Sequence, residues 1–99
     1  MLFGMFSENV WKPTISRLRE CTRVGYESAY RTHIRDRWSN VDMDAINVAG
    51  IESWLDSFDR PGAARKAYAV FRAILRLAYR QGVTDNDVTR REIRLPHLR

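Results

Sequence analysis

Hydrophobic residues recur at three- and four-residue steps along most of the chain, and this spacing predicts α-helices rather than strands. The pattern is clearest between residues 64 and 82. There the apolar positions share one helical face and predict one side of a core; they are Ala64, Ala67, Tyr68, Phe71, Ile74, Leu75 and Ala78. Pro61 suits the first turn of this long helix, and Gly82 suits the residue just beyond its end.

The same spacing predicts helices before the long one. Residues 11–21 predict a short helix with Pro13 near its start and Ile15, Leu18 and Cys21 facing inward. Thr22 is expected to cap a helix that runs to about Trp38. The inner side of that second helix is expected to hold Tyr26, Ala29, Tyr30, His33, Ile34 and Arg37.

Asn47 is expected to cap a further helix whose apolar stripe is Val48, Ile51, Trp54, Leu55 and Phe58. After the long helix, Thr84 or Asp85 is expected to cap a final short helix with Val88 and Ile93 turned inward.

The sequence therefore predicts an all-α fold, a compact bundle of four to five helices. The core is expected to be built around Tyr30, Ile34, Ile51, Leu55, Phe71, Ile74, Leu75 and Ala78. Residues 15–92 form the predicted helical domain. Residues 1–14 are an extension without an assigned role, open to packing on the core or to contact with a neighbouring protomer. Residues 93–99, in which Pro96 opposes a helix, are expected to begin a linker.

Charge is distributed unevenly along these helices. From Asp42 to Asp59 the chain has five acidic residues and no basic one, whereas from Arg60 to Thr84 it has six basic residues and no acidic one. Arg72, Arg76 and Arg80 stand four residues apart with no acid to neutralise them, a spacing that destabilises an isolated helix. The long helix therefore predicts an anionic partner for its outer face.

Arginine supplies 15 of the 17 basic residues, and its planar fork suits phosphates and base edges. Nucleic acid is thus the favoured partner class, with an ordinary solvated surface in an arginine-rich chain as the alternative. The candidate DNA-binding residues point outward from two predicted helices; they are Arg31, Arg35, Arg65, Lys66, Arg72, Arg76 and Arg80.

The sequence contains no recognisable catalytic, phosphate-binding or metal-binding motif. It has no Gly-rich phosphate loop, no nucleophile elbow and no metal-binding helix pattern. Cys21 is the single cysteine and is expected to be a small core residue, whereas His33 is expected to be packed or at the rim of the core. The short apolar opening lacks a basic region and cannot span a membrane. We therefore expect a cytoplasmic protein without a cofactor, a metal or a membrane partner.

Short motifs in a fixed order give a more specific hypothesis. They are Thr22 with Tyr26; His33 with Ile34; Ile46, Asn47 and Ile51; and Ala78, Gly82, Val83 and Asn86. This order resembles the N-terminal core-binding domain of tyrosine recombinases, the phage integrase family, over roughly residues 15 to 92. That SAM-like domain typically reads T-x3-Y-x7-hI, then I-T-x-x-x-I, then a long helix ending in Ala followed by Gly, an apolar residue and Asn-Pro.

Three positions depart from the family pattern. Asp87 replaces the proline, residues 63–64 are alanines where a threonine is usual, and a segment with Trp38 and Ser39 replaces a Leu-Gly pair. These changes affect the expected local geometry more than the expected fold.

The resemblance implies one half of a C-shaped clamp around double-stranded DNA, with the helix of Arg31 and Arg35 and the long helix near the major groove. It implies that an arginine-lysine-histidine-arginine set and a nucleophilic tyrosine lie in a separate catalytic domain. The chain is then expected to be an inert fragment of a recombinase of bacterial, phage or mobile-element origin. Its expected partners are the catalytic domain of the same parent chain and other recombinase protomers.

Two other functions remain open at this stage. The bundle could be a protein-interaction domain that docks an acidic partner through its basic face, which joint exposure of Trp11, Trp38 and Trp54 would favour. A helix at a membrane surface ranks last, because the apolar face of the long helix is needed for the core.

Overall fold

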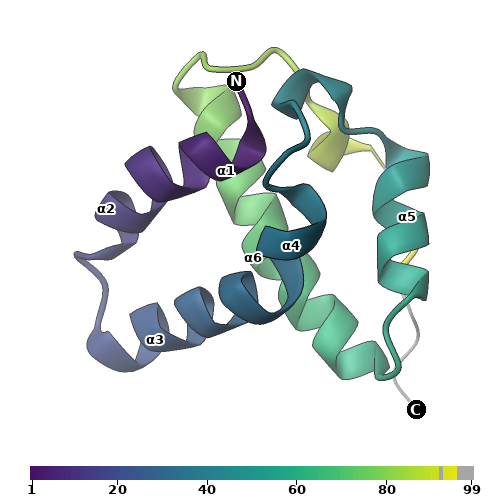
Figure 1. Ribbon diagram of the computed structural model, residues 1–99, viewed down its shortest axis with the longest axis horizontal. Coiled ribbons are helices and arrows are strands. Elements are labelled where there is room, and N and C mark those ends of the chain that lie inside the picture. The colour runs from purple at the N-terminus through teal and green to yellow at the C-terminus, as the bar shows by residue number, and fades with distance from the viewer. Residues whose placement is uncertain (92, 96–99) are drawn as a thin grey trace.

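The first helical segment begins near the N-terminus. The computed structural model describes residues 1–91 and 93–95, and its chain is helical without a break from residue 3 to residue 15 (Figure 1). The segment consists of α1 (Phe3–Phe6), the π-type turn η1 (Ser7–Trp11) and α2 (Lys12–Ile15). The helix expected over residues 11–21 therefore starts earlier and ends earlier than the sequence suggested.

The second helical segment runs from residue 20 to Trp38, so the expected C-terminal limit is confirmed. It consists of α3 (Glu20–Ala29), the π-type turn η2 (Tyr30–Ile34) and α4 (Arg35–Trp38). Its N-cap is Arg19, whereas Thr22 lies inside the first turn. The prediction that Thr22 is the N-cap was therefore wrong.

A short 3-10 turn, η3 (Met43–Ala45), leads to α5 (Val48–Asp56). Asn47 caps α5 as expected, since its side-chain oxygen accepts a hydrogen bond of 2.7 Å from the Gly50 amide. The long helix α6 (Pro61–Arg80) begins at the expected proline and is followed by Gly82 with a φ of 77°. Glycine adopts that left-handed conformation without a steric penalty, which explains why the helix stops there.

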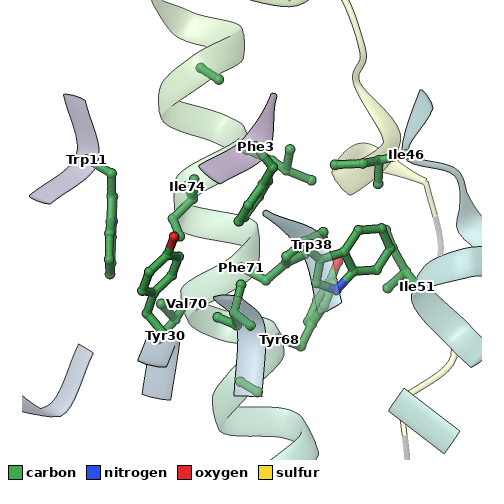
Figure 2. Packing of buried hydrophobic residues seen from close by; sticks show 14 of the residues in the cluster. Phe3, Trp11, Tyr30, Trp38, Ile46, Ile51, Tyr68, Val70, Phe71 and Ile74 are labelled. Atoms are coloured by element: carbon green, nitrogen blue, oxygen red, sulfur yellow. The ribbon is translucent and has the colours of Figure 1, made fainter. Parts of the chain in front are cut away.

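Helix α6 is the centre of the core. In Figure 1 it crosses the middle of the molecule, with α1, α2 and α3 on one side and α5 on the other. All eight residues expected at the centre of the core are buried. The ring centroids of Trp38, Phe3 and Trp54 lie 4.9, 5.2 and 5.2 Å from that of Phe71 in α6. Figure 2 shows Phe3 and Trp38 beside Phe71. No strand occurs in the described residues, and the all-α bundle is confirmed.

Residues 1–14 pack on the core. Phe3, Phe6 and Trp11 are buried in the hydrophobic cluster. The amides of Phe3 and Gly4 donate hydrogen bonds to the carbonyls of Val41 and Ser39, at 2.9 and 3.0 Å. A Cβ added at Gly4 would lie 2.8 Å from the Cβ of Ser39, so this close approach requires glycine.

Four residues that were expected to face the core are exposed instead. Leu18 lies in the turn after α2, Cys21 and Tyr26 lie on α3, and Arg37 lies on α4. Only Ala29 of α3 is buried, because the first turns of that helix extend away from α6 (Figure 1). The helical period alone therefore did not predict which of these positions the neighbouring elements cover.

The segment after α6 folds back onto the turn before α5. The Asn86 side-chain amide donates to the carbonyls of Met43 and Ile46, both at 2.8 Å. The hydroxyl of Thr84 accepts a hydrogen bond from the Asn86 backbone amide at 3.1 Å and donates one to a carboxylate oxygen of Asp44.

These bonds place a short 3-10 turn, η4 (Val88–Arg90), beside α6. Val88 is buried and Ile93 partly buried, as expected. The prediction that Thr84 or Asp85 caps the final short helix was wrong, since Asp87 is the N-cap of η4. The expectation for Pro96 in the linker lies outside the described residues.

Candidate nucleic-acid interface

The outward side of α6 forms a basic face, defined here as Arg65, Lys66, Arg72, Arg76 and Arg80. All five side chains are exposed, and α6 contains no acidic residue. The other exposed residues of α6 are small or aromatic: Gly62, Ala69, Ala73 and Tyr79. At a rise of about 1.5 Å per residue, the basic face is about 22 Å long.

Three of the five cations of this face have no acidic partner among the described residues. Arg72, Arg76 and Arg80 form no ion pair within the described part of the chain. Basic side chains elsewhere do find carboxylates: Lys12 pairs with Glu8 at 2.8 Å, Arg23 with Glu27 at 3.6 Å and Arg94 with Asp56 at 3.1 Å. Cations with carboxylate partners therefore occur on other elements, while the charges of Arg72, Arg76 and Arg80 are available to an external anion.

The apolar side of α6 fixes the direction of these arginines. Nine of its residues are buried against the other elements; they are Ala64, Ala67, Tyr68, Val70, Phe71, Ile74, Leu75, Leu77 and Ala78. Rotation of the helix about its axis would expose this face, so the opposite side is held toward solvent. Burial also raises the pKa of the Tyr68 phenol, an effect that the nearby Arg72 partly opposes.

Arg31 and Arg35 lie on the second helical segment and are exposed, as expected. Arg31 belongs to η2 and forms no ion pair with a described residue. Arg35, in α4, lies 3.8 Å from a carboxylate oxygen of Asp36, a long contact between two exposed groups. Such pairs contribute little to stability, so the Arg35 charge is still accessible.

Folding brings Arg76 and Arg80 together with a residue that sequence reasoning did not select. They line a hollow of about 360 Å³ between α6 and η4, and Arg90 lines its other side. The Arg90 guanidinium lies over the ring of Tyr79, 5.1 Å from its centroid. The one sequence signal was the basic pair of Arg90 and Arg91 in the predicted final short helix; the position of this pair beside α6 depends on the fold.

The geometry gives little support to a metal site or to a membrane-spanning helix in the described residues. His33 is half-buried and packs against Phe58 with ring centroids 5.1 Å apart, as expected for a rim histidine. Within the described residues, no three His, Cys, Asp or Glu side chains are grouped as a metal site would require. No helix in that part of the chain is both long enough and apolar enough to cross a membrane.

Trp11, Trp38 and Trp54 are all buried, so the exposed tryptophan cluster that would favour a protein-interaction domain is not found. Comparison with protein-family models, with curated proteins and with solved structures finds no match for this chain. The candidate interface therefore rests on the residues of the chain itself.

Proposed function

We propose that this chain binds double-stranded DNA through the basic face of α6. The observation that carries the proposal is the composition of that face: every exposed residue is a cation, a small residue or Tyr79, and Arg72, Arg76 and Arg80 form no ion pair with a described residue. Like charges in such a row repel one another, and DNA phosphates would remove that cost.

The shape of the face also suits DNA. The major groove of B-form DNA is about 12 Å wide and admits an α-helix. Ala69 and Ala73 are exposed between the arginines and add little bulk, so the helix backbone can approach the groove closely. The long arginine side chains can then reach phosphates on either side or hydrogen-bond to base edges.

More specifically, we propose that the chain is a core-binding domain of a tyrosine recombinase. The motif order quoted above supports it, and so do the outward arginines on two of the helices. On this proposal the chain is one half of a clamp on the recombination site. It acts beside a catalytic domain of the same parent chain and beside other protomers, and strand cleavage belongs to that catalytic domain.

The test is a titration of a short fluorescent DNA duplex with the purified chain, followed by anisotropy at several salt concentrations. We expect micromolar or weaker affinity, because one half of a clamp lacks the contacts of the other half. The logarithm of the binding constant should fall with the logarithm of salt by about 0.9 for each phosphate contact. No covalent protein–DNA product should form.

A polyglutamate of matched charge serves as the competing ligand. Binding of polyglutamate as tight as binding of the duplex would favour the alternative of an acidic protein partner. Failure to bind the duplex even at low salt would end the proposal.

A further inference from the structure

The hollow between the end of α6 and η4 differs from the rest of the basic face because it is concave and has two walls. Arg76, Tyr79 and Arg80 come from α6, and Asp87, Thr89 and Arg90 come from the η4 region. Two aliphatic side chains of α6, Ala73 and Leu77, complete the lining. Arg90 is positioned by the burial of Val88 and by the hydrogen bonds of Asn86 to the turn before α5.

The charges in the hollow favour an anion. Three guanidinium groups face one carboxylate, that of Asp87, and none of the three forms an ion pair with a described residue. Arg90 instead lies over the Tyr79 ring. Guanidinium groups that approach from two elements can hold a phosphate with several charge-assisted hydrogen bonds, an arrangement that a single helix face does not provide.

The volume and the remaining lining of the hollow indicate a ligand larger than a bare phosphate. About 360 Å³ lies within the range of small-molecule pockets, which combine an apolar wall with a few polar groups. Here Leu77, Ala73 and the Tyr79 ring supply the apolar wall, and Thr89 supplies a hydroxyl group. A sugar or a base attached to the phosphate would find contacts on that wall.

We propose that this hollow binds one nucleotide, with Arg76, Arg80 and Arg90 holding its phosphate and with Tyr79 and Leu77 contacting its sugar or base. The inference deepens the proposed DNA binding and rests on it for the identity of the natural ligand. A nucleotide of a DNA strand and a free nucleotide share this chemistry, and the experiment separates the two sources.

The experiment is an NMR titration of the ¹⁵N-labelled chain with deoxyadenosine 5′-monophosphate. Amide signals of residues 76–80 and 88–90 should shift, with saturation in the millimolar range. Deoxyadenosine, which lacks the phosphate, should cause no comparable shift, and inorganic phosphate should bind more weakly than the nucleotide. Shifts of equal size with deoxyadenosine, or no shift in the two segments, would overturn the proposal.

Variants in the hollow sharpen the test. Arg90→Gln should weaken nucleotide binding about tenfold, as expected for the loss of a charge-assisted hydrogen bond. Asp87→Asn removes the one carboxylate of the hollow and should tighten binding by roughly threefold. Unchanged nucleotide affinity in both variants, with the spectrum of the folded chain retained, would contradict the assignment.

Arg72→Gln is the matched control, because Arg72 belongs to the basic face but does not line the hollow. It should leave nucleotide affinity unchanged and weaken duplex binding. If Arg90→Gln also weakens duplex binding, the nucleotide belongs to a DNA strand; if only nucleotide binding weakens, the ligand is free. Duplex binding through Arg72 without any nucleotide binding would refute this inference and leave the proposed function standing.

Discussion

The ring of Phe3 stacks on the ring of Phe71, with centroids 5.2 Å apart and planes inclined by 22°. Both side chains are fully buried, although 67 residues separate them in the sequence. The contact joins the first helical turn of the chain to the middle of α6, the helix that carries the basic face. The N-terminal segment is therefore part of the platform that orients the candidate interface.

Phe3→Ala should destabilise the fold strongly. Truncation of a buried phenylalanine costs about 3–5 kcal/mol, a large part of the stability of a domain of this size, and Phe71→Ala should cost a similar amount. Urea denaturation followed by circular dichroism measures the change. Met5→Ala is the control, because Met5 lies in the same helix and is 53% exposed. Equal stability of Phe3→Ala and Met5→Ala would show that the N-terminal helix does not pack as described.

The joint replacement of Arg72 and Arg76 by glutamine should reduce the salt dependence of DNA binding. If both side chains contact phosphates, the slope of log K against log salt should become shallower by up to about 1.8. Stability should hold or rise slightly, because a repulsive pair at four-residue spacing is removed. If one of the two instead contacts a guanine edge, sequence discrimination should fall while the slope changes less.

The control for this pair is the joint replacement of Lys12 and Arg23 by glutamine. It removes the same net charge, but both side chains already pair with glutamates in their own helical segments. The slope of log K against log salt for this control variant should then match that of the unmodified chain. Tight DNA binding by the Arg72 and Arg76 variant at every salt concentration would rule out α6 as the DNA-binding face.

Asn86→Ala should loosen the segment that carries η4. The Asn86 side chain donates to two carbonyls and accepts from the Val88 amide at 3.2 Å. Removal of the side-chain amide leaves the two carbonyls and the Val88 amide without these partners, which should lower the free energy of unfolding by about 1–3 kcal/mol. Thermal denaturation measures the loss. Asn86→Asp keeps the acceptor but turns a carboxylate oxygen toward the two carbonyls, and it should destabilise the chain at least as much.

Tyr68 should make stability depend on alkaline pH. Burial raises the pKa of its phenol above the ordinary value of 10.0. The folded chain then keeps a proton that the unfolded chain loses, so the free energy of unfolding should fall as pH rises above about 10. Urea denaturation at a series of pH values measures this. Tyr68→Phe should show a smaller decline, and an identical decline would mean that Tyr68 does not contribute.

The sequence by itself determined the elements whose signals are local. Helix α6 was predictable from Pro61 to Gly82, because the helical period, the N-terminal proline and the C-terminal glycine all act within a few residues. The basic face was predictable from the same period, because burial of one side of a helix leaves the opposite side exposed. Asn47 was likewise recognised as a cap because its bond to Gly50 spans three residues.

Only the tertiary structure decided which faces are covered and which distant residues meet. The period placed Leu18, Cys21 and Tyr26 on apolar faces, but all three are exposed, and Leu18 lies in a turn rather than on a helix. Arg90 joins Arg76 and Arg80 only because Asn86 ties its segment to a turn some forty residues earlier. A helical period shows which side chains share a face, whereas burial and site assembly depend on contacts between segments that are distant in the sequence.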